Sequence, residues 1–325
     1  MSGRAAAGTS PTERSGAVGK SIDVVGTGLT VLDRIYLKGS GIAAEELGGS
    51  CGNVLLSLAM LHWRVAPVLN LGMDDVGRRL VDEFIRAGAD TRFIRRSVGS
   101  LSPIIAQHLD GAAGRHSFAF RCPETNEALP QYEPIGHEDV RQAVPALSDC
   151  SVFYTDRSSA AIVAAMEFAR AAGAVVFFEP SEVGERHLFQ RAVECSSILK
   201  FSVDRIGRLA DHGGLPEGAA CILTQGGGGL EVSMGGESRR MPAVPASAVR
   251  DTCGAGDMVS VGLIDHLIAR PPSVRGAPDM ATLVPGLEAG QRLAAENCAY
   301  EGARGLFGSC GADYARSVLG RLRGA

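Results

Sequence analysis

The sequence of 325 residues lacks the features of a membrane protein or a nucleic-acid-binding protein. It has no run of about 18 uncharged apolar residues, which a helix that crosses a bilayer would need. Its 32 basic and 36 acidic residues give a formal net charge of -4, so no general positive field attracts a phosphate backbone. Aromatic residues, at 5%, are too few for extended base-stacking platforms. We therefore expect neither a membrane nor a nucleic acid as partner.

Paired cysteines and an apolar leader are also missing. The eight cysteines are scattered without a C-x-x-C pair, which argues against a structural zinc site and a redox motif. We expect reduced thiols and a cytoplasmic location. Residues 1–20 are small, polar and weakly basic, without the apolar segment that a secretory signal requires. They predict a disordered N-terminal tail, followed by a folded domain over residues 21–325.

Short apolar runs alternate with segments of helical periodicity along the rest of the chain. The first run, Ile22 to Val25, enters Gly26-Thr27-Gly28 and continues to Asp33, which predicts a buried strand that carries Asp33 to a sheet edge. Further strands are expected at 68–71, 152–154, 175–178, 197–199 and 221–224, and helices at 54–61, 76–87, 160–172, 204–210, 255–268 and 287–302. This alternation is typical of an α/β protein with a doubly wound, mostly parallel sheet and helices on both faces.

Two segments interrupt the alternation. Residues 34–48 are only partly apolar, and residues 103–121 contain a hairpin of 104–109 with 117–120. We expect these segments to form a small β lid. An exposed strand of such a lid could also pair with a second copy of the chain in a homodimer.

The strongest signal of chemistry is Asp251-Thr-Cys-Gly254-Ala255-Gly256-Asp257, at the start of an apolar helical stretch. Free amides at a helix N-terminus, left uncovered by Gly254, Ala255 and Gly256, form an anion hole that can hold a transferring phosphoryl group. Asp257 beside this hole is placed to take a proton from an attacking hydroxyl group. The alternative is an ordinary glycine-rich turn with an acid in the first helical turn.

A second glycine cluster, Gly226 to Gly229, follows the expected strand that ends at Thr224. No lysine follows the cluster and no helix begins there, so neither a P-loop nor a dinucleotide-binding fingerprint fits. By itself the cluster predicts a hairpin turn.

Together, these motifs resemble those of the ribokinase or PfkB family of carbohydrate and nucleoside kinases, over nearly the whole chain after residue 20. Asp251 to Asp257 meets the D-T-x-G-A-G-D signature of that family. Gly48-Gly49-Ser-Cys-Gly-Asn53 is similar to its G-G-x-x-x-N signature, and Thr224 to Gly229 is similar to its T-x-G-x-x-G turn. Asn297 to Gly305 looks like the stretch beside the adenine pocket and the monovalent-cation loop.

The resemblance implies an ATP-dependent kinase with a ribokinase-like fold. It assigns the general base to Asp257, the anion hole to the amides of Gly254, Ala255 and Gly256, and sugar binding to Asp33, Gly48, Gly49 and Asn53. It assigns nucleotide binding to Lys200, Ser202, Thr224, Gly226, Gly229 and Asn297. The implied cofactors are ATP and Mg2+, with a monovalent cation such as K+ near Asp251.

One stretch departs from the family pattern. The family carries an N-x-x-E motif whose acid organises magnesium through water, whereas this chain has Ser202 and Arg205 at those positions. Asp204 lies one residue away and is our candidate for a substitute metal ligand, while Arg205 could contact phosphate directly. The departure also raises the alternative of a non-catalytic, ligand-binding relative.

The expected substrate is a small molecule with an alcohol group. Asp33 can accept hydrogen bonds from hydroxyl pairs, and the Asn53 amide both donates and accepts, which suits a sugar. A nucleoside, as for an adenosine-like kinase, is the alternative, but the lid segment offers only Tyr36 for stacking on a base. A sugar phosphate would need a further cation, for which the candidates are Arg34, Lys38, Arg115 and Arg121.

Overall fold

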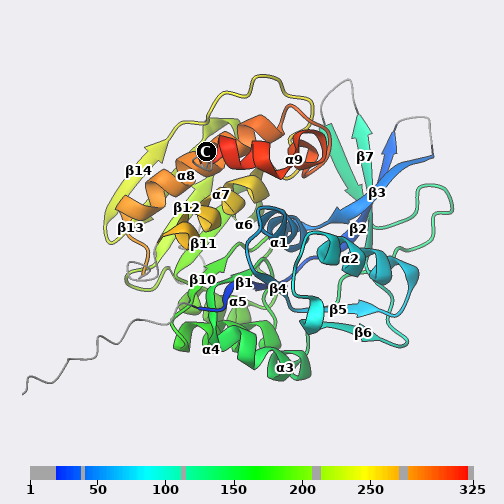
Figure 1. Cartoon of the computed structure of the whole chain (residues 1–325), viewed down its shortest axis with the longest axis horizontal. Coiled ribbons are helices and arrows are strands. Elements are labelled where there is room, and N and C mark those ends of the chain that lie inside the picture. Colours follow the sequence, from blue (N-terminus) through cyan, green and yellow to red (C-terminus); the bar gives the residue numbers. More distant parts are fainter. Residues whose placement is uncertain (1–19, 38–40, 111–114, 207–213, 271–276, 321–325) are drawn as a thin grey trace, which may run out of the picture.

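A computed structural model describes residues 20–37, 41–110, 115–206, 214–270 and 277–320 of the chain (Figure 1). The expected N-terminal tail lies outside these residues, apart from Lys20, and so do residues 207–210 of the helix expected at 204–210. In the described part of the chain, no helix is long and apolar enough to cross a membrane.

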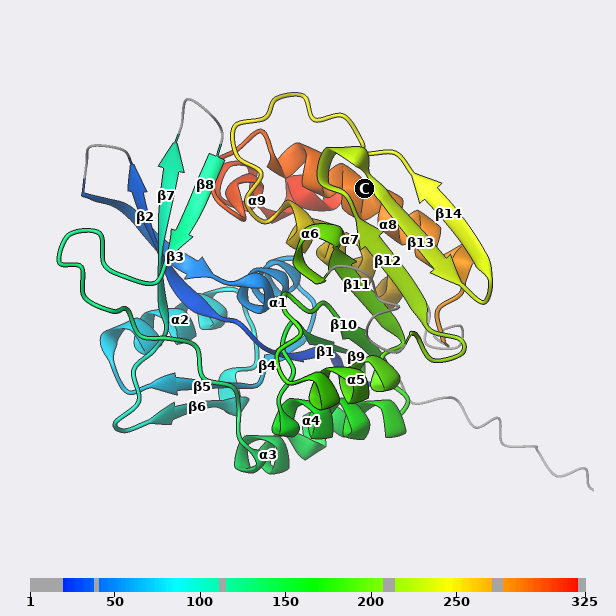
Figure 2. The ribbon, with the colours of Figure 1, turned by 180° about the vertical axis from the view of Figure 1, so that it is seen from behind.

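The central sheet has eight strands among the described residues, in the order β14-β13-β12-β11-β10-β9-β1-β4. The strands from β12 to β4 run parallel, and β13 and β14 add an antiparallel edge (Figure 2). Their bounds are β1 Ile22–Thr27, β4 Val65–Pro67, β9 Cys150–Thr155, β10 Val175–Phe178, β11 Ile198–Ser202, β12 Ala220–Thr224, β13 Leu230–Met234 and β14 Glu237–Met241.

Both faces of this sheet are apolar, because successive residues of each strand point to opposite sides. In β1, Val24 packs into one hydrophobic core and Val25 into another. The first core is covered by α1 (Ser50–Met60), α7 (Ala255–Ala269), α8 (Met280–Asn297) and α9 (Gly305–Val318). The second is covered by α3 (His137–Ser148), α4 (Ala160–Ala171) and α5 (Arg186–Cys195), below the sheet in Figure 1. The predicted fold class, a doubly wound and mostly parallel α/β sheet, is confirmed.

A second sheet stands to one side of the central sheet (Figure 1). Its order is β3-β2-β7-β8, with β2 and β7 parallel and the outer strands antiparallel to their neighbours. The strands are β2 Val31–Leu37, β3 Ile42–Gly48, β7 Ile104–Asp110 and β8 Arg115–Ala119. They fall largely in the segments expected to form the lid, and their action as a lid stays a prediction.

Asp33 does not lie where the sequence placed it. The first strand ends at Thr27, and Asp33 belongs to β2 of the second sheet, where it pairs in register with Glu46 of β3. The chain turns at Gly28, whose φ of 143° suits only glycine, and a Cβ there would lie 1.9 Å from Oδ1 of Asp156. The glycine therefore ends the first strand and sends β2 into another sheet.

Several elements differ from the sequence pattern for local reasons. The last predicted helix, 287–302, is α8, which begins at Met280 and contains Pro285. The strand expected at 68–71 is β5 (Leu69–Gly72), which pairs with β6 (Ile94–Ser97) outside the central sheet and precedes α2 (Asp75–Arg86). The patterns also missed α3, α5, α9, β4, β6 and β14. Pro145 inside α3 and the left-handed Gly311 inside α9 hid two of these helices, because both features normally end a helix.

Helices α7 and α8 approach each other through glycine. A Cβ on Gly262 of α7 would lie 2.3 Å from the Cα of Gly290 in α8. The close backbone approach leaves no room for a methyl group, so α7, which carries Asp257, is held against α8 at a fixed distance.

We expect Gly262→Ala to lower the free energy of unfolding by about 1–3 kcal/mol, because a methyl group would overpack this contact. Gly308→Ala in α9 is the matched control, since a Cβ there meets nothing within 4 Å. That substitution should be neutral or stabilising by about 0.5–1 kcal/mol. Urea unfolding followed by the fluorescence of Trp63, the single tryptophan, measures both. Equal stability of the two variants would contradict the packing argument.

Candidate active site

The N-terminus of α7 forms a cradle of small residues. Gly254 precedes the helix with a φ of 70°, and a Cβ there would lie 2.5 Å from the carbonyl oxygen of Ala303. The amide of Ala255 donates to Thr252 O at 3.2 Å, so this one of the three predicted amides is engaged in a turn. A Cβ on Gly256 would meet only Nζ of Lys200, at 3.8 Å. The helix start therefore opens onto space bordered by an ammonium group, which suits an anion.

Asp257 lies buried beside this cradle. Nδ2 of Asn53 in α1 donates a hydrogen bond to Asp257 Oδ2 at 2.7 Å. Burial, together with the nearby negative charge of Glu179, raises the pKa of Asp257 to about 7, although the Asn53 hydrogen bond and the Lys200 charge act to lower it. A carboxyl group with this pKa is suited to accepting a proton near neutral pH.

Glu179, directly after β10, links Asp257 to the sheet. Its carboxylate pairs with Lys200 and accepts hydrogen bonds from Ser260 Oγ and, at 3.0 Å, from Tyr154 Oη. Lys200 is almost fully buried and also donates to Gly256 O at 3.0 Å. Glu179 directly follows the strand that the sequence predicts at 175–178. Its signal was its place at the end of a buried strand.

The predicted sugar-binding residues meet across β2, β3 and the start of α1. A Cβ on Gly48 would lie 1.9 Å from Oδ2 of Asp33, so the Asp33 carboxylate lies over a residue that must be glycine. Gly49 has a φ of 80° and accepts the backbone hydrogen bond of Asn53 at 2.8 Å. Asp33 is buried like Asn53.

Three aspartates that the sequence assigned to the site lie near the thiol of Cys253. Burial, followed by the charges of Asp251, Asp33 and Asp257, raises the pKa of this thiol. The structure therefore brings the second sheet, through Asp33, to the start of α7.

Asp251 and Asn297 brace the turn that follows α8. Asp251 accepts from the amides of Cys253 at 2.8 Å and Gly302 at 2.9 Å. Asn297 donates to Ala303 O at 3.2 Å and accepts from the amide of Leu306 at 3.0 Å. Both side chains are buried, so their local effect is to fix the 298–306 turn beside α7.

The remaining predicted residues lie at the ends of β11 and β12. Ser202 pairs in register with Thr224, whose hydroxyl group donates to Phe201 O at 3.3 Å. Gly226 to Gly228 form a single turn, and Gly229, with a φ of 91°, leads into β13, so the expected hairpin is confirmed. Asp204 and Arg205 are both exposed in α6 (Val203–Ile206). Asp257, by contrast, is buried.

Two charged residues at the site were not assigned by the sequence. Asp156 is fully buried after β9, accepts from the amide of Leu29 at 2.8 Å and pairs with Arg157 at 3.0 Å. Burial raises its pKa. Arg304 is also buried and donates to the side chain of Asn53 and to Leu47 O. Asp156 carried a signal, since it follows a strand, whereas Arg304 stands in a turn whose path the sequence did not reveal.

A small cavity adjoins this region, lined by Thr27, Gly28, Thr30, Leu69, Asn70, Leu71, Tyr132, Glu133 and Ile135. Among the described residues, the buried hydroxyl groups of Thr27 and Tyr132 have no hydrogen-bond partner. Each can donate to a polar guest in the cavity.

Comparisons with known proteins agree with this arrangement. Residues 43–306 match the pfkB family of carbohydrate kinases. A fructokinase from Klebsiella pneumoniae is 25% identical over 277 residues, which cover 79% of this chain and 87% of the fructokinase.

Two solved structures share the fold. A fructokinase from Xylella fastidiosa with bound ATP superposes with a TM-score of 0.72 at 21% identity, over 86% of this chain and 93% of that one. A double mutant of a fructokinase from Vibrio cholerae, with fructose, ADP and a potassium ion bound, gives a TM-score of 0.70 at 20% identity, over 89% of this chain and 96% of that one.

Substitution of the two glycines of the cradle by alanine should have opposite effects on the stability of the protein. Gly254→Ala forces a Cβ into the left-handed region and against Ala303, so it should cost about 2 kcal/mol or more of stability. Gly256→Ala leaves the helix intact, so the melting temperature of this variant should equal or exceed that of the wild type. Because the added methyl group fills the cradle, ATP should raise the melting temperature of the variant less than that of the wild type. Thermal denaturation with and without ATP measures both effects. An undiminished ATP-induced shift in Gly256→Ala would contradict the anion hole.

Proposed function

This chain belongs to the pfkB family of carbohydrate kinases, and on that premise we propose that it transfers the γ-phosphoryl group of ATP to a hydroxyl group of an unphosphorylated sugar. As a member of this family it is an ATP-dependent carbohydrate kinase. The observation that carries the proposal is the buried Asp257 carboxylate, held by Asn53 at the mouth of a helix N-terminus that lies beside Lys200.

In the proposed reaction, Asp257 takes the proton of the attacking sugar hydroxyl group. The hydroxyl oxygen forms a bond to the γ-phosphorus atom while the bond to the β-γ bridging oxygen breaks, and ADP leaves with that electron pair. The amides of Gly254 and Gly256, together with the Lys200 ammonium, stabilise the negative charge on the phosphoryl oxygens, whereas the Ala255 amide is engaged by Thr252 O. Lys200 reaches this point because Glu179 and Gly256 O hold its Nζ atom.

An unphosphorylated sugar fits the charges of the site better than a sugar phosphate. The carboxylates of Asp33, Asp156 and Asp257 offer acceptors for hydroxyl groups and repel a second anion. Of the cations that could anchor a phosphate, Arg34 is paired with Glu45 at 2.7 Å, and Arg121 donates to Asn126 at 3.1 Å. The side chains of Lys38 and Arg115 lie outside the described residues.

A nucleoside is not favoured. Tyr36, the aromatic residue that the lid segment offers for stacking, is buried and packs against His108 with ring centroids 5.6 Å apart. Its face is therefore not free for a base.

We propose that the nucleotide lies along the ends of β11 and β12, contacted by Ser202, Thr224, Gly226 and Gly229, with Asn297 shaping the adenine side. The register of Ser202 with Thr224, which brings the ends of β11 and β12 together, supports this placement. The similar fructokinase from Xylella fastidiosa binds ATP. Asp251 is our candidate for holding a monovalent cation, in line with the potassium ion of the Vibrio cholerae fructokinase. Free cysteines and dependence on ATP fit a cytoplasmic enzyme.

Magnesium would be carried chiefly by the nucleotide. The described residues contain no cluster of three or more His, Cys, Asp or Glu side chains that could hold a metal ion. Glu179 already accepts from Lys200, Tyr154 and Ser260, which suits an indirect contact through water more than direct ligation. Mg2+ in such sites keeps several waters and binds phosphate oxygens, whose charge it neutralises. Asp204 stays a candidate for an outer contact.

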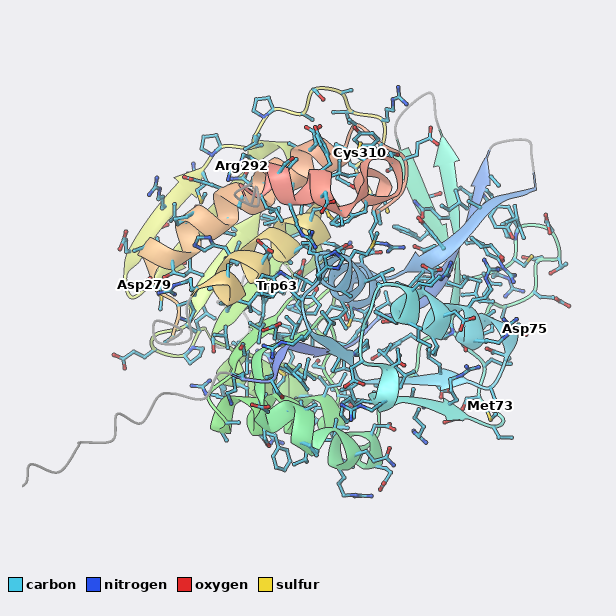
Figure 3. All side chains as sticks on the ribbon, in the orientation of Figure 1. Trp63, Met73, Asp75, Asp279, Arg292 and Cys310 are labelled. Carbon is cyan, nitrogen blue, oxygen red and sulfur yellow. The ribbon has the colours of Figure 1, made fainter. Side chains whose placement is uncertain are left out.

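We expect Asp257→Asn to lower sugar-dependent ADP release by at least about 100-fold, because the amide cannot accept the proton. The assay compares free sugars, sugar phosphates and nucleosides in the presence of ATP and magnesium. Asp75→Asn is the control, since Asp75 also stands in the first turn of a helix but is exposed (Figure 3). It should retain wild-type turnover.

Turnover with a nucleoside and no sugar would overturn the sugar assignment. No turnover with any class, while ATP still raises the melting temperature, would favour a non-catalytic relative.

The pH dependence follows from the raised pKa of Asp257. The base must be ionised in the free enzyme, and the ionised fraction grows as pH rises, so kcat/KM should increase through a midpoint near the pKa of about 7. An unperturbed aspartate would place this limb near pH 4 instead, by its ordinary pKa of about 3.9. A profile that is flat from about pH 5.5 to about pH 8.5 would contradict the raised pKa of Asp257.

A further inference from the structure

We propose that Arg304 is the positioning residue that locks the orientation of the Asn53 amide and couples strand β3 to the general base. This inference rests on the proposed function, since it concerns how the base Asp257 is held. The guanidinium of Arg304 donates through Nη1 to Asn53 Oδ1 and through Nη2 to Leu47 O of β3. The family resemblance places Arg304 within the stretch from Asn297 to Gly305 but gives this residue no role of its own.

The turn that carries Arg304 is held on both sides. Asn297 donates to the carbonyl group of Ala303 and accepts from the amide of Leu306, so it fixes the residues that flank Arg304. Ala303 also packs against Gly254, at the mouth of α7. The Arg304 side chain is 7% exposed, and a buried arginine with a fixed backbone has little freedom to leave its partners.

The contact with Arg304 decides which way the Asn53 amide points. An amide has an oxygen that accepts and a nitrogen that donates, and a flip exchanges the two. Arg304 can only donate, so the oxygen must face it, and the nitrogen is left to donate to Asp257. In the flipped amide, the oxygen would face the Asp257 carboxylate and the nitrogen would face the guanidinium. Both contacts would then be repulsive.

The locked amide bears on the proton affinity of the base. Asn53 donates to the ionised carboxylate and thereby opposes the effects of burial and of Glu179. The titratable groups that face Asp257 are Glu179 after β10, Lys200 of β11, Asp156 after β9, Tyr154 of β9, Cys51 of α1 and Cys253 before α7. Arg304 acts on the base through Asn53. Without Arg304 the Asn53 amide would no longer be held in the orientation that donates to Asp257, so the pKa of Asp257 should rise.

The same guanidinium reaches the second sheet. Nη2 donates to Leu47 O and lies 3.8 Å from Oε2 of Glu46, both in β3. Burial raises the pKa of Glu46, and the charge of Arg304 opposes that rise. Leu47 precedes Gly48, which lies against the Asp33 carboxylate. One cation, the Arg304 guanidinium, thus contacts strand β3 next to the sugar-binding residues and contacts the base through Asn53.

The test compares Arg304→Met with wild type by the pH dependence of kcat/KM. The acid limb of Arg304→Met should move to higher pH by about 0.5 units or more, with a fall in kcat of about 10-fold or more. Arg304→Lys, which keeps the charge but cannot grip both oxygens, should recover part of the loss. Arg95→Met is the matched control, because Arg95 pairs with the buried Asp139 of α3. It should leave the limb in place.

A second measurement does not depend on turnover. In protein labelled with 13C at the aspartate carboxyl groups, the Asp257 signal is assigned by its absence in Asp257→Asn, and its titration midpoint is followed by NMR. The midpoint should rise in Arg304→Met. In the Asn53→Ala background, Arg304→Met should add little further shift, because the amide through which it acts is gone. If the wild-type protein turned over no sugar, the proposed function would be wrong. The titration midpoint of Asp257 would still test the role of Arg304.

An unchanged midpoint in folded Arg304→Met would overturn the proposal, as would a full further shift in the Asn53→Ala background. Folding is checked by circular dichroism and by the fluorescence of Trp63 (Figure 3), whose indole N–H donates to Asp265. If Arg304→Met does not fold, Arg304→Gln decides, since glutamine can donate to only one of the two oxygens and should give an intermediate midpoint.

Discussion

The Asp257 carboxylate is kept away from water, and a buried charge is costly unless nearby groups compensate for it. Compensation here comes from separate parts of the chain. Asn53 in α1 donates to Asp257 directly, while Lys200 in β11 supplies a positive charge that Glu179 shares. The result is a carboxyl group whose pKa is raised but which keeps partners for its ionised form. Such a balance requires α1, α7, β10 and β11 to be packed together before the base has its properties.

Glycine makes this packing sterically feasible. Gly48 lies against the Asp33 carboxylate, Gly28 lies against Asp156, and Gly254 lies against the backbone of Ala303. At each of these points a Cβ would lie within 2.5 Å of an oxygen atom. A larger side chain at any of these three positions would prevent polar groups of the site from approaching the backbone so closely. Three of the 42 glycines of this chain therefore have a steric reason to be glycine.

Much of the site could be predicted from local sequence, and the part that could not depends on distant residues. The start of α7 follows from Gly254 to Asp257, because the amides of a helix N-terminus point outward whatever the rest of the chain does. Arg304 and Asn53 are 251 residues apart, and no periodicity or motif links them. Asp33 was expected at the edge of the first sheet, but Gly28 ends β1 and the pairing of β2 with β3 decides its place. Register of this kind is a property of two strands, not of one.

By itself the sequence determined the alternation of strands and helices, the two-faced apolar pattern of β1 and its neighbours, and the amide cradle before Asp257. These are local, because they depend on the spacing of residues within one element. The tertiary structure decided the proton affinity of Asp257, the ion pair of Lys200 with Glu179, and the meeting of Arg304 with Asn53. Burial and Coulomb interactions depend on which surfaces come together, and that is settled only when the sheets and helices have packed.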